Sequence, residues 1–143
     1  MFMGEYNHTI DSKGRLIIPS KFREQLGEKF VLTRGMDGNL AIYPMDAWKV
    51  FEQKLATLPL LSQKARTFIR FLVSGAQECE LDKQGRILVP PTLRTHAKLD
   101  KDVLLNGYLD HVEVWSKEVW EEKNDFSDMD SIAEGLQETG IIL

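Results

Sequence analysis

A five-residue motif that occurs twice constrains this chain more than any other feature. The first copy is Asp11-Ser12-Lys13-Gly14-Arg15, followed by an apolar run and Pro19. The second copy is Asp82-Lys83-Gln84-Gly85-Arg86, followed by an apolar run and Pro90. Asp, Gly, Arg and Pro therefore recur at one constant offset, which is 71 residues (82 minus 11 for the aspartates).

The repeat extends on both sides of the motif. Gly4 corresponds to Gly75, and Phe22-Arg23 corresponds to Leu93-Arg94. One inserted residue then shifts the correspondence by one position. In this register, Val31-Leu32 corresponds to Val103-Leu104, Gly35 to Gly107, Ile42-Tyr43 to Val114-Trp115, and Trp48 to Trp120. A duplicated unit of roughly 45 residues cannot bury its own apolar face, so the two copies should pack on each other. We expect one domain with pseudo-twofold symmetry.

The unit reads as strand, turn, strand, short helix, strand, turn, strand. In the first copy, residues 4–10 alternate like a strand, 11–14 form a turn in which Gly14 supplies a positive φ, and 15–18 return as a second strand. Because 15–18 are nearly all apolar, this strand is predicted to be buried on both faces. Ser20 is predicted to cap a helix over 21–26 that ends at Gly27, and a hairpin follows over 30–33 and 40–43. The second copy repeats these elements at 76–81, 86–89, 92–97, 103–105 and 112–115.

These patterns divide the chain into four parts. We expect a first repeat at 5–47, a helical connector at 48–75, a second repeat at 76–119 and an acidic C-terminal tail at 120–143. The connector contains two helical segments separated by Pro59, and the second opens at Ser62 and stops at Gly75. In the tail, Ser131 and Glu134 have the spacing of a capping box, but we expect this segment to be weakly ordered or docked on a partner subunit.

Composition is that of a globular protein, with 43% hydrophobic and 28% charged residues in 143. No apolar run is long enough for a membrane helix and no secretory signal is visible, so we expect a cytoplasmic protein. Cys79 is the only cysteine, which excludes an intrachain disulfide.

The net charge of −4 is unevenly distributed along the chain. Residues from Lys117 onward hold eight acidic and two basic groups, whereas 11–23 hold four basic groups and one aspartate. A basic patch on an acidic protein is therefore possible.

Catalytic chemistry finds no support in the residues. His8, His96 and His111 lie far apart, and none has metal-ligand spacing with a carboxylate or with the cysteine. A glycine-rich phosphate loop and a nucleophile elbow are both missing from the sequence. We expect no enzyme, no metal, no cofactor and no small-molecule ligand.

Two interpretations of the repeated motif remain open from the residues alone. In the first, Asp11 with Arg15 and Asp82 with Arg86 fix tight turns through a charge-assisted hydrogen bond. In the second, each arginine sits at a strand edge beside a lysine-bearing turn, where its planar fork suits phosphate and guanine edges. A further pair, Arg66 and Arg70, shares a helix face and could clamp a phosphate, although a solvated face is the better interpretation.

The same residues carry a family resemblance that covers nearly the whole chain. Four stretches of the chain resemble the bacterial MraZ family, a duplicated relative of the AbrB-type regulators. They are Met-Phe-Met-Gly-Glu-Tyr, His-Thr-Ile-Asp-Ser-Lys-Gly-Arg, Ile-Pro-Ser-Lys-Phe-Arg and the later Glu-Leu-Asp-Lys-Gln-Gly-Arg-Ile. The resemblance implies a mainly β fold with short helices, in which two repeats and a helical connector build a swapped-hairpin β-barrel. It also implies a ring-shaped homo-oligomer that binds double-stranded DNA at the promoter of the division and cell-wall gene cluster, usually as a repressor.

Carried onto this chain, the resemblance makes Arg15 and Arg86 the presumed DNA contacts. Lys13, Lys83 and the glycine turns Gly14 and Gly85 assist them, while Asp11 and Asp82 are structural. The copies differ, because Gln84 stands where the first copy has Lys13, so the two motifs need not contact DNA equally. The alternative from a different class is a protein-interaction scaffold in which the arginines only fix the turns.

Overall fold

The computed structural model describes residues 1–141 and contains eight strands and six helices in these residues. Their order within each repeat is strand, strand, helix, strand, strand, helix, helix, so the connector helices and the tail helices occupy equivalent places. The first repeat comprises β1 (Glu5–Thr9), β2 (Arg15–Ile17), α1 (Ser20–Leu26), β3 (Phe30–Arg34), β4 (Leu40–Pro44), α2 (Met45–Ala56) and α3 (Gln63–Gly75). The second comprises β5 (Gln77–Cys79), β6 (Arg86–Leu88), α4 (Pro91–His96), β7 (Asp102–Tyr108), β8 (His111–Ser116), α5 (Lys117–Lys123) and α6 (Met129–Gln137).

The strands exchange partners between the repeats. Six of them form one antiparallel sheet in the order β1-β7-β8-β4-β3-β5, and β2 pairs with β6 in a separate two-stranded ribbon. β1 therefore pairs with β7 of the second repeat, and β5 pairs with β3 of the first. Read from either edge, the strand order has the same pattern about the central β4–β8 pair, as the expected pseudo-twofold symmetry requires.

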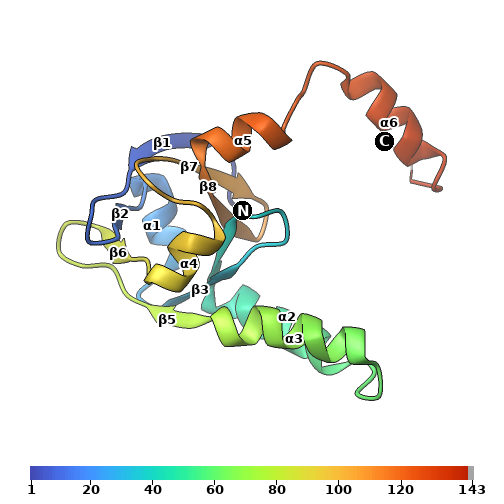
Figure 1. Cartoon of the computed structure of the whole chain (residues 1–143), viewed down its shortest axis with the longest axis horizontal. Coiled ribbons are helices and arrows are strands. Elements are labelled where there is room, and N and C mark those ends of the chain that lie inside the picture. Colours follow the sequence, from blue (N-terminus) through green and yellow to red (C-terminus); the bar gives the residue numbers. More distant parts are fainter. Residues whose placement is uncertain (142–143) are drawn as a thin grey trace.

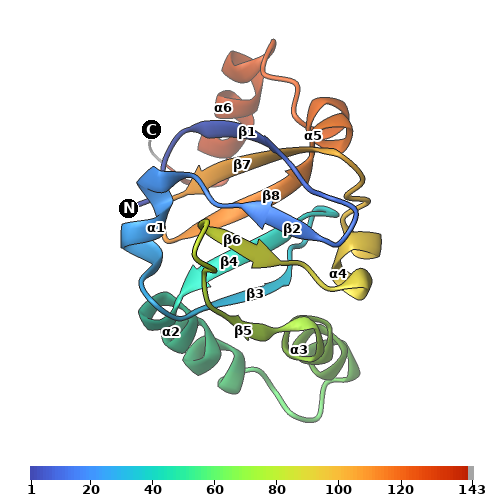
Figure 2. The same cartoon turned by 90° about the vertical axis from the view of Figure 1, so that its left-hand side faces the viewer.

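The ribbon lies across one face of the six-stranded sheet, as Figure 2 shows, and the core fills the space between them. Leu16 and Ile18 from the first repeat and Ile87 and Val89 from the second point inward and are buried. They meet buried side chains of the large sheet and of α1 and α4, namely Phe22, Leu26, Phe30, Leu32, Leu40, Ile42, Leu93, Val103, Leu105, Val112 and Val114. Both repeats contribute to a single core, which confirms that they pack on each other.

Two expectations about β2 were wrong. We predicted that 15–18 return along 4–10 as a hairpin, but only the bridge between Ile10 and Leu16 joins them, and β2 pairs instead with β6. We also predicted burial on both faces, but Ile17 is 39% exposed. The physical reason is that β2 sits in a ribbon with one face on the core and one in solvent, so its side chains alternate between the two.

Helix caps also differ from the predictions at two places. Ser20 is the first residue of α1, after Pro19, and its side chain makes no capping hydrogen bond. In the tail, α6 begins at Met129 after Asp128, so Ser131 lies inside the helix and does not cap it. The predicted Ser62 cap is confirmed, since its Oγ accepts a hydrogen bond from Ala65 N at the start of α3. Gly27 ends α1 with a φ of 78°, as predicted.

Three further helices, α2, α3 and α5, pack against the strands of the large sheet. α2 buries Trp48 and Leu55, α3 buries Leu72, and α5 buries Val119 beside Trp115. α5 spans the boundary that we expected between 119 and 120. Figure 1 shows β2 and β6 at one end, while α2, α3 and α6 extend away from them at the other. Within residues 1–141, none of the helices has both the length and the apolar character needed to cross a membrane.

Candidate nucleic-acid interface

The first motif forms a tight turn held by the carboxylate of Asp11. Its Oδ1 accepts hydrogen bonds from the backbone N–H groups of Lys13, at 3.0 Å, and Arg15, at 2.9 Å. Its Oδ2 accepts from Arg15 Nε at 2.6 Å, and Gly14 N donates to the carbonyl of Asp11 at 3.0 Å. The backbone N–H of Arg15 is the main reason that the pKa of Asp11 lies below its ordinary value. Asp suits this position because its short side chain reaches two backbone donors of its own turn while its second oxygen accepts from Arg15 Nε.

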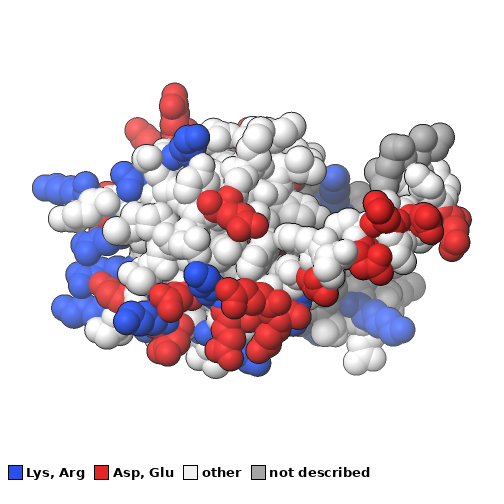
Figure 3. All heavy atoms as spheres, turned by 90° about the horizontal axis from the view of Figure 1, so that it is seen from above, with Lys and Arg blue, Asp and Glu red and all other residues white. Residues whose placement is uncertain are grey.

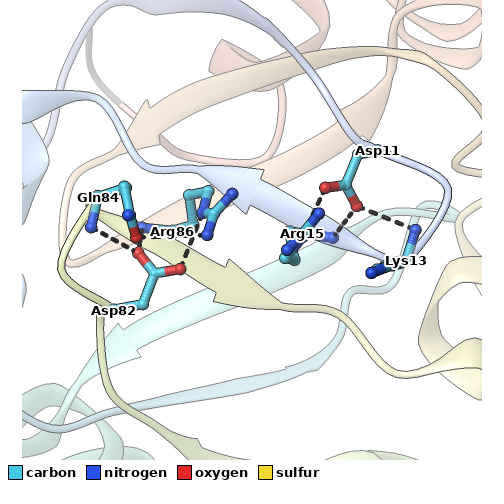
Figure 4. A network of polar contacts seen from close by, with 6 residues as sticks. All are labelled: Asp11, Lys13, Arg15, Asp82, Gln84 and Arg86. Carbon is cyan, nitrogen blue, oxygen red and sulfur yellow. Dashed lines mark hydrogen bonds and ion pairs between the residues drawn. The ribbon is translucent and has the colours of Figure 1, made fainter.

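The second motif repeats this geometry with one addition. Asp82 accepts from the backbone N–H groups of Gln84 and Arg86, both at 2.9 Å, and from Arg86 Nε at 2.8 Å. Its pKa is lowered, again chiefly by the backbone N–H of Arg86. In addition, Arg86 Nη2 donates to Gln84 Oε1 at 3.3 Å, a contact that Lys13 cannot make in the first copy (Figure 4). Gln84, which stands where the first copy has Lys13, thus gives Arg86 a hydrogen-bond acceptor that Arg15 lacks.

The aspartates orient the two guanidinium groups without using all of their donors. Each carboxylate takes the Nε–H, and within residues 1–141 the terminal nitrogens of Arg15 have no hydrogen-bond partner. The side chains of Arg15 and Arg86 are 38% and 26% exposed. A guanidinium fixed at Nε and free at its fork can engage a planar acceptor pair in two parallel hydrogen bonds. The same arginine can therefore fix its turn through Nε and still offer its terminal nitrogens to a phosphate or a guanine edge.

Arginine and apolar side chains alternate on the solvent face of the ribbon. In the antiparallel register of β2 and β6, Arg15 lies opposite Leu88 and Ile17 lies opposite Arg86. Leu88 is 58% exposed, and it lies opposite Arg15 and two residues along β6 from Arg86. Figure 4 shows the two motifs at opposite ends of this ribbon. The ribbon brings together two motifs that the sequence separates by a whole repeat.

Each turn is also held by the other repeat, which the sequence analysis missed. The carbonyl of Gly14 accepts from Val89 N at 2.7 Å, and the carbonyl of Gly85 accepts from Ile18 N at 2.9 Å. A Cβ on Gly14 would lie 2.6 Å from the Val89 carbonyl oxygen and 3.0 Å from the Arg94 guanidinium. The conformations have φ of 86° at Gly14 and 76° at Gly85, which confirms the positive φ predicted at the first turn.

Arg23 and Arg94 support the two glycine turns from the opposite repeat, a role that the sequence analysis did not give them. Arg23 of the first repeat lies against Gly85 of the second, and its Nε donates to the carbonyl of Ile18 at 2.7 Å. Arg94 lies against Gly14 in the reciprocal position. Their recurrence in the repeat alignment was the available signal, since an arginine retained in both copies outside the motif indicates a shared contact.

Positive charge gathers near the ribbon and negative charge near the tail. Figure 3 shows Lys and Arg side chains concentrated at the ribbon end of the molecule and Asp and Glu side chains on the projecting C-terminal part. Lys13, Lys21 and Lys83 are exposed residues of the motif regions. Arg66, by contrast, donates to the carbonyl of Leu60 at 2.8 Å on the far helices, so it holds a loop there and is not part of the ribbon. Within residues 1–141, no group of His, Cys, Asp and Glu side chains has the arrangement of a metal site.

Comparison with known proteins identifies the family. A family model described as "MraZ protein, putative antitoxin-like" matches twice, over residues 1–71 and 72–137. The chain is 59% identical over 143 residues to the transcriptional regulator MraZ of Caldanaerobacter subterraneus subsp. tengcongensis, covering 99% of this chain and 100% of that protein. It is 54% identical over 143 residues to the protein of the same name from Alkaliphilus metalliredigens, with the same coverage, and 60% identical over 120 residues to that of Desulfitobacterium hafniense, covering 84% of each. Two family matches, one on each repeat, and these identities over the full length show that the chain belongs to the MraZ family.

Proposed function

We propose that this protein is a cytoplasmic, nucleoid-associated transcription regulator that binds specific double-stranded DNA through the β2–β6 ribbon. The observation that carries the proposal is the solvent face of that ribbon, where two arginines are oriented by aspartates and exposed beside apolar side chains. The relatives at 54–60% identity are named transcriptional regulators, which supports the same function. The protein acts without a cofactor.

The ribbon suits the major groove in size and chemistry. A two-stranded β-ribbon fits a groove about 12 Å wide, and Arg15 and Arg86 present donors that match guanine O6 and N7. Ile17 and Leu88 contact thymine methyl groups, which are the apolar features of that groove. Lys13 and Lys83 lie on the turns at the ribbon ends, where they bind phosphates, and the turns at Gly14 and Gly85 bring the backbone close to the DNA.

Several copies act together on the operator. One bidentate base contact supplies only about 1–3 kcal/mol of discrimination, so two arginines are too few for a specific regulator acting alone. We infer a ring-shaped homo-oligomer of swapped-hairpin barrels that presents the ribbons to short repeated boxes, about 10 base pairs apart. It represses the promoter of the division and cell-wall gene cluster.

The test is a mobility shift with DNA from upstream of the protein's own gene, measured at two salt concentrations. Arg15→Ala should weaken binding by about 5- to 150-fold, equivalent to 1–3 kcal/mol. Arg15→Lys keeps the charge but loses the fork, so it should lose most of the same affinity. Lys83→Ala should weaken all sequences equally and lower the salt dependence. The matched control is Lys29→Ala, an exposed lysine outside the ribbon, which should bind as the wild type does.

The competing function is a protein-interaction scaffold, and one observation favours it. Exposed Ile17 and Leu88 form an apolar surface that a protein partner could also cover. Under that function, binding to DNA shows little sequence preference and Arg15→Lys behaves like the wild type. Arg15→Ala would then lower the melting temperature, because the arginine only fixes the turn. Specific binding with an unchanged melting temperature excludes the scaffold.

The oligomer predicts a dependence on box number and spacing. Two boxes should bind much more tightly than one, because the second contact is intramolecular. Inserting about 5 base pairs, half a helical turn, should remove most of that gain by rotating the second box away from the protein. Equal affinity for one box, two boxes and the half-turn insertion would show that the copies bind independently.

A further inference from the structure

We propose that a cavity on the outer face of the large sheet binds a small organic cation, one whose charge lies on an amidinium or guanidinium group. The cavity has a volume of about 230 Å³. The ribbon covers the opposite face of the sheet, as Figure 2 shows, so this site is separate from the candidate DNA contacts. The inference goes beyond the proposed function, and a failure to bind DNA would leave it unaffected.

The cavity lies between the central strands β4 and β8 and the helices α2 and α3. Side chains of these strands alternate between the two faces of the sheet. Leu40, Ile42, Val112 and Val114 belong to the core under the ribbon. The residues between them face the other way. The lining of the cavity includes Ala41, Tyr43, Phe51, Tyr108, His111 and Glu113. Aromatic rings and a carboxylate therefore meet in one small space.

Glu113 is held as an acceptor in the middle of this outer face. Its Oε1 accepts hydrogen bonds from Asn106 Nδ2 at 3.1 Å and Trp115 Nε1 at 3.2 Å. Its Oε2 accepts from Asn39 Nδ2 at 3.2 Å. A carboxylate has about four acceptor positions, so these neutral donors leave one position open on Oε2. Ala41, which lies opposite Glu113 in the β4–β8 register, has only a methyl group there and leaves room for a ligand.

Within residues 1–141, the negative charge of Glu113 has no counter-ion, since none of the ion pairs in this part of the chain includes it. Arg34 also lines the cavity, but its Nη1 donates to the Phe71 carbonyl at 2.8 Å and to Ser74 Oγ at 3.1 Å, so α3 holds its guanidinium. Asp37 lines the cavity as well and adds a second negative charge. A partly buried carboxylate without a cation carries a desolvation cost that a cationic ligand would offset.

Aromatic rings along the cavity favour the same sign of charge. Tyr43 stacks on His111 with ring centroids 4.6 Å apart, and Tyr108 lies against the same imidazole at 4.9 Å. His111 Nδ1 is engaged by Asp110 Oδ1 at 2.7 Å, so it does not pair with Glu113. Burial, together with the negative charges of Asp110 and Glu113, raises the pKa of Tyr43 to about 12, so its phenol stays protonated. Phenol rings attract cations through the negative potential of their faces.

The class of ligand follows from this lining. A planar amidinium or guanidinium group donates N–H groups to a carboxylate and stacks on aromatic rings. An ammonium ion is more strongly hydrated and loses more on entering such a site. The volume lies below the ~300–1,000 Å³ of pockets for drug-sized ligands, so one ring or a short chain bearing the cation fits. The sequence analysis expected no small-molecule ligand, because the lining residues share no motif and only the fold brings them together.

Benzamidine and benzamide test the charge requirement on the full-length protein. The two molecules have nearly the same size and shape, but only benzamidine is a cation. Isothermal titration calorimetry should give benzamidine a Kd on the order of 0.1 mM, which is reasonable for so small a ligand. Benzamide should bind at least about tenfold more weakly, because it lacks the positive charge that pairs with Glu113. Equal affinities, or no binding of benzamidine, would overturn the proposal.

Three single substitutions locate the site. Glu113→Gln removes the charge with little change in shape and should weaken benzamidine binding about tenfold or more, while changing benzamide binding much less. Tyr108→Leu keeps an apolar side chain but loses the ring, so it should weaken benzamidine binding about two- to fivefold. Glu28→Gln, the control, makes the same charge change on an exposed residue elsewhere and should bind as the wild type does. Benzamidine binding that Glu113→Gln and Tyr108→Leu leave unchanged would place the ligand elsewhere and overturn the proposal.

Circular dichroism of each variant checks the fold. Tyr108 is 53% exposed, so Tyr108→Leu should fold as the wild type does. If Glu113→Gln fails to fold, Tyr108→Leu and the comparison of benzamidine with benzamide still decide the proposal.

Sedimentation distinguishes a free ligand from a side chain of a second copy. A basic side chain of another copy carries the same chemistry, and saturating benzamidine would displace it and lower the molecular mass in solution. An unchanged mass with benzamidine bound supports a free cation as the occupant. A lower mass would overturn the free ligand and assign the cavity to a contact between copies.

Discussion

Alanine substitution of four glycines separates backbone strain from steric contact in the motif turns. Gly14, Gly85 and Gly27 all have a positive φ, of 86°, 76° and 78°. A Cβ at Gly27 would meet nothing within 4 Å, whereas at Gly14 it would meet the Val89 carbonyl and at Gly85 the Arg23 guanidinium. The three positions therefore share a conformational cost but differ in the neighbour that a methyl group would displace.

The magnitudes follow from these contacts. A non-glycine residue in the left-handed region costs about 1–2 kcal/mol, so Gly27→Ala should destabilise by that amount. Overpacking adds about 1–3 kcal/mol, which brings Gly14→Ala to about 2–5 kcal/mol. Gly85→Ala should fall between them, because a guanidinium can move, although Arg23 then loses its hydrogen bond to Ile18. At Gly14 the obstacle is backbone, whose displacement breaks the Val89–Gly14 hydrogen bond.

Urea denaturation at one fixed protein concentration, followed by circular dichroism, gives the free energy of unfolding of each variant. A fourth variant, Gly135→Ala, is the control, because a Cβ there meets nothing and alanine favours a helix by about 1 kcal/mol. Thermal melting should shift by about 2–4 °C for each kcal/mol. Equal losses for Gly14→Ala and Gly27→Ala would refute the cross-repeat contact at the first turn.

Three further predictions concern the motif and the tail. Asp11→Asn keeps an acceptor for the backbone donors, so it should lose less stability than Asp11→Ala. Because the pKa of Asp11 is lowered in the fold, its contribution to the free energy of unfolding should be complete at neutral pH and lost as the pH falls through that lowered value. NMR titration of the carboxyl group would check this. Gln84→Lys removes the contact that holds Arg86 Nη2 and adds a positive charge, so binding to a single DNA box should tighten and become more salt-dependent in mobility shifts; unchanged binding would contradict the assigned role of Gln84. A stop codon after Asn124 should leave single-box affinity nearly unchanged at physiological salt, since α6 lies at the far end from the ribbon and charges beyond about 8 Å are screened; a large gain would reveal an inhibitory tail.

Local sequence patterns predicted the elements well and the strand partners poorly. The hairpin of β3 and β4, the short helix ending at Gly27 and the connector helix from Ser62 to Gly75 each have a signal within a few residues, and all three are confirmed. The pairing of β2 with β6 has no local signal, because the turn at Gly14 is equally compatible with an ordinary hairpin. Which strand receives β2 is decided by the burial of Leu16 and Ile18 against residues of both repeats. That choice depends on long-range packing, which a single repeat does not contain.

The same distinction holds for the candidate site. Its motif residues stand out because they recur, but the sequence places Arg15 and Arg86 a full repeat apart, and only the β2–β6 register brings them onto one ribbon. The exposure of Ile17 follows from that register as well. Arg23 and Arg94 recur too, yet their contacts cross between repeats, so reading either copy alone gives them no role.

These reciprocal contacts explain why the two motifs belong to one functional unit. Each glycine turn receives a backbone hydrogen bond and an arginine side chain from the opposite repeat, so neither turn keeps its geometry if the other repeat unfolds. The arginine that each turn orients is thereby fixed relative to its counterpart across the ribbon. A pair of donors at a fixed separation is what recognition of a regular double helix requires, since the acceptors on DNA are themselves at fixed separations. Duplication within one chain also allows the two positions to differ, and Gln84 at the position equivalent to Lys13 is such a difference. Under the proposed function, one ribbon could therefore read an asymmetric DNA sequence.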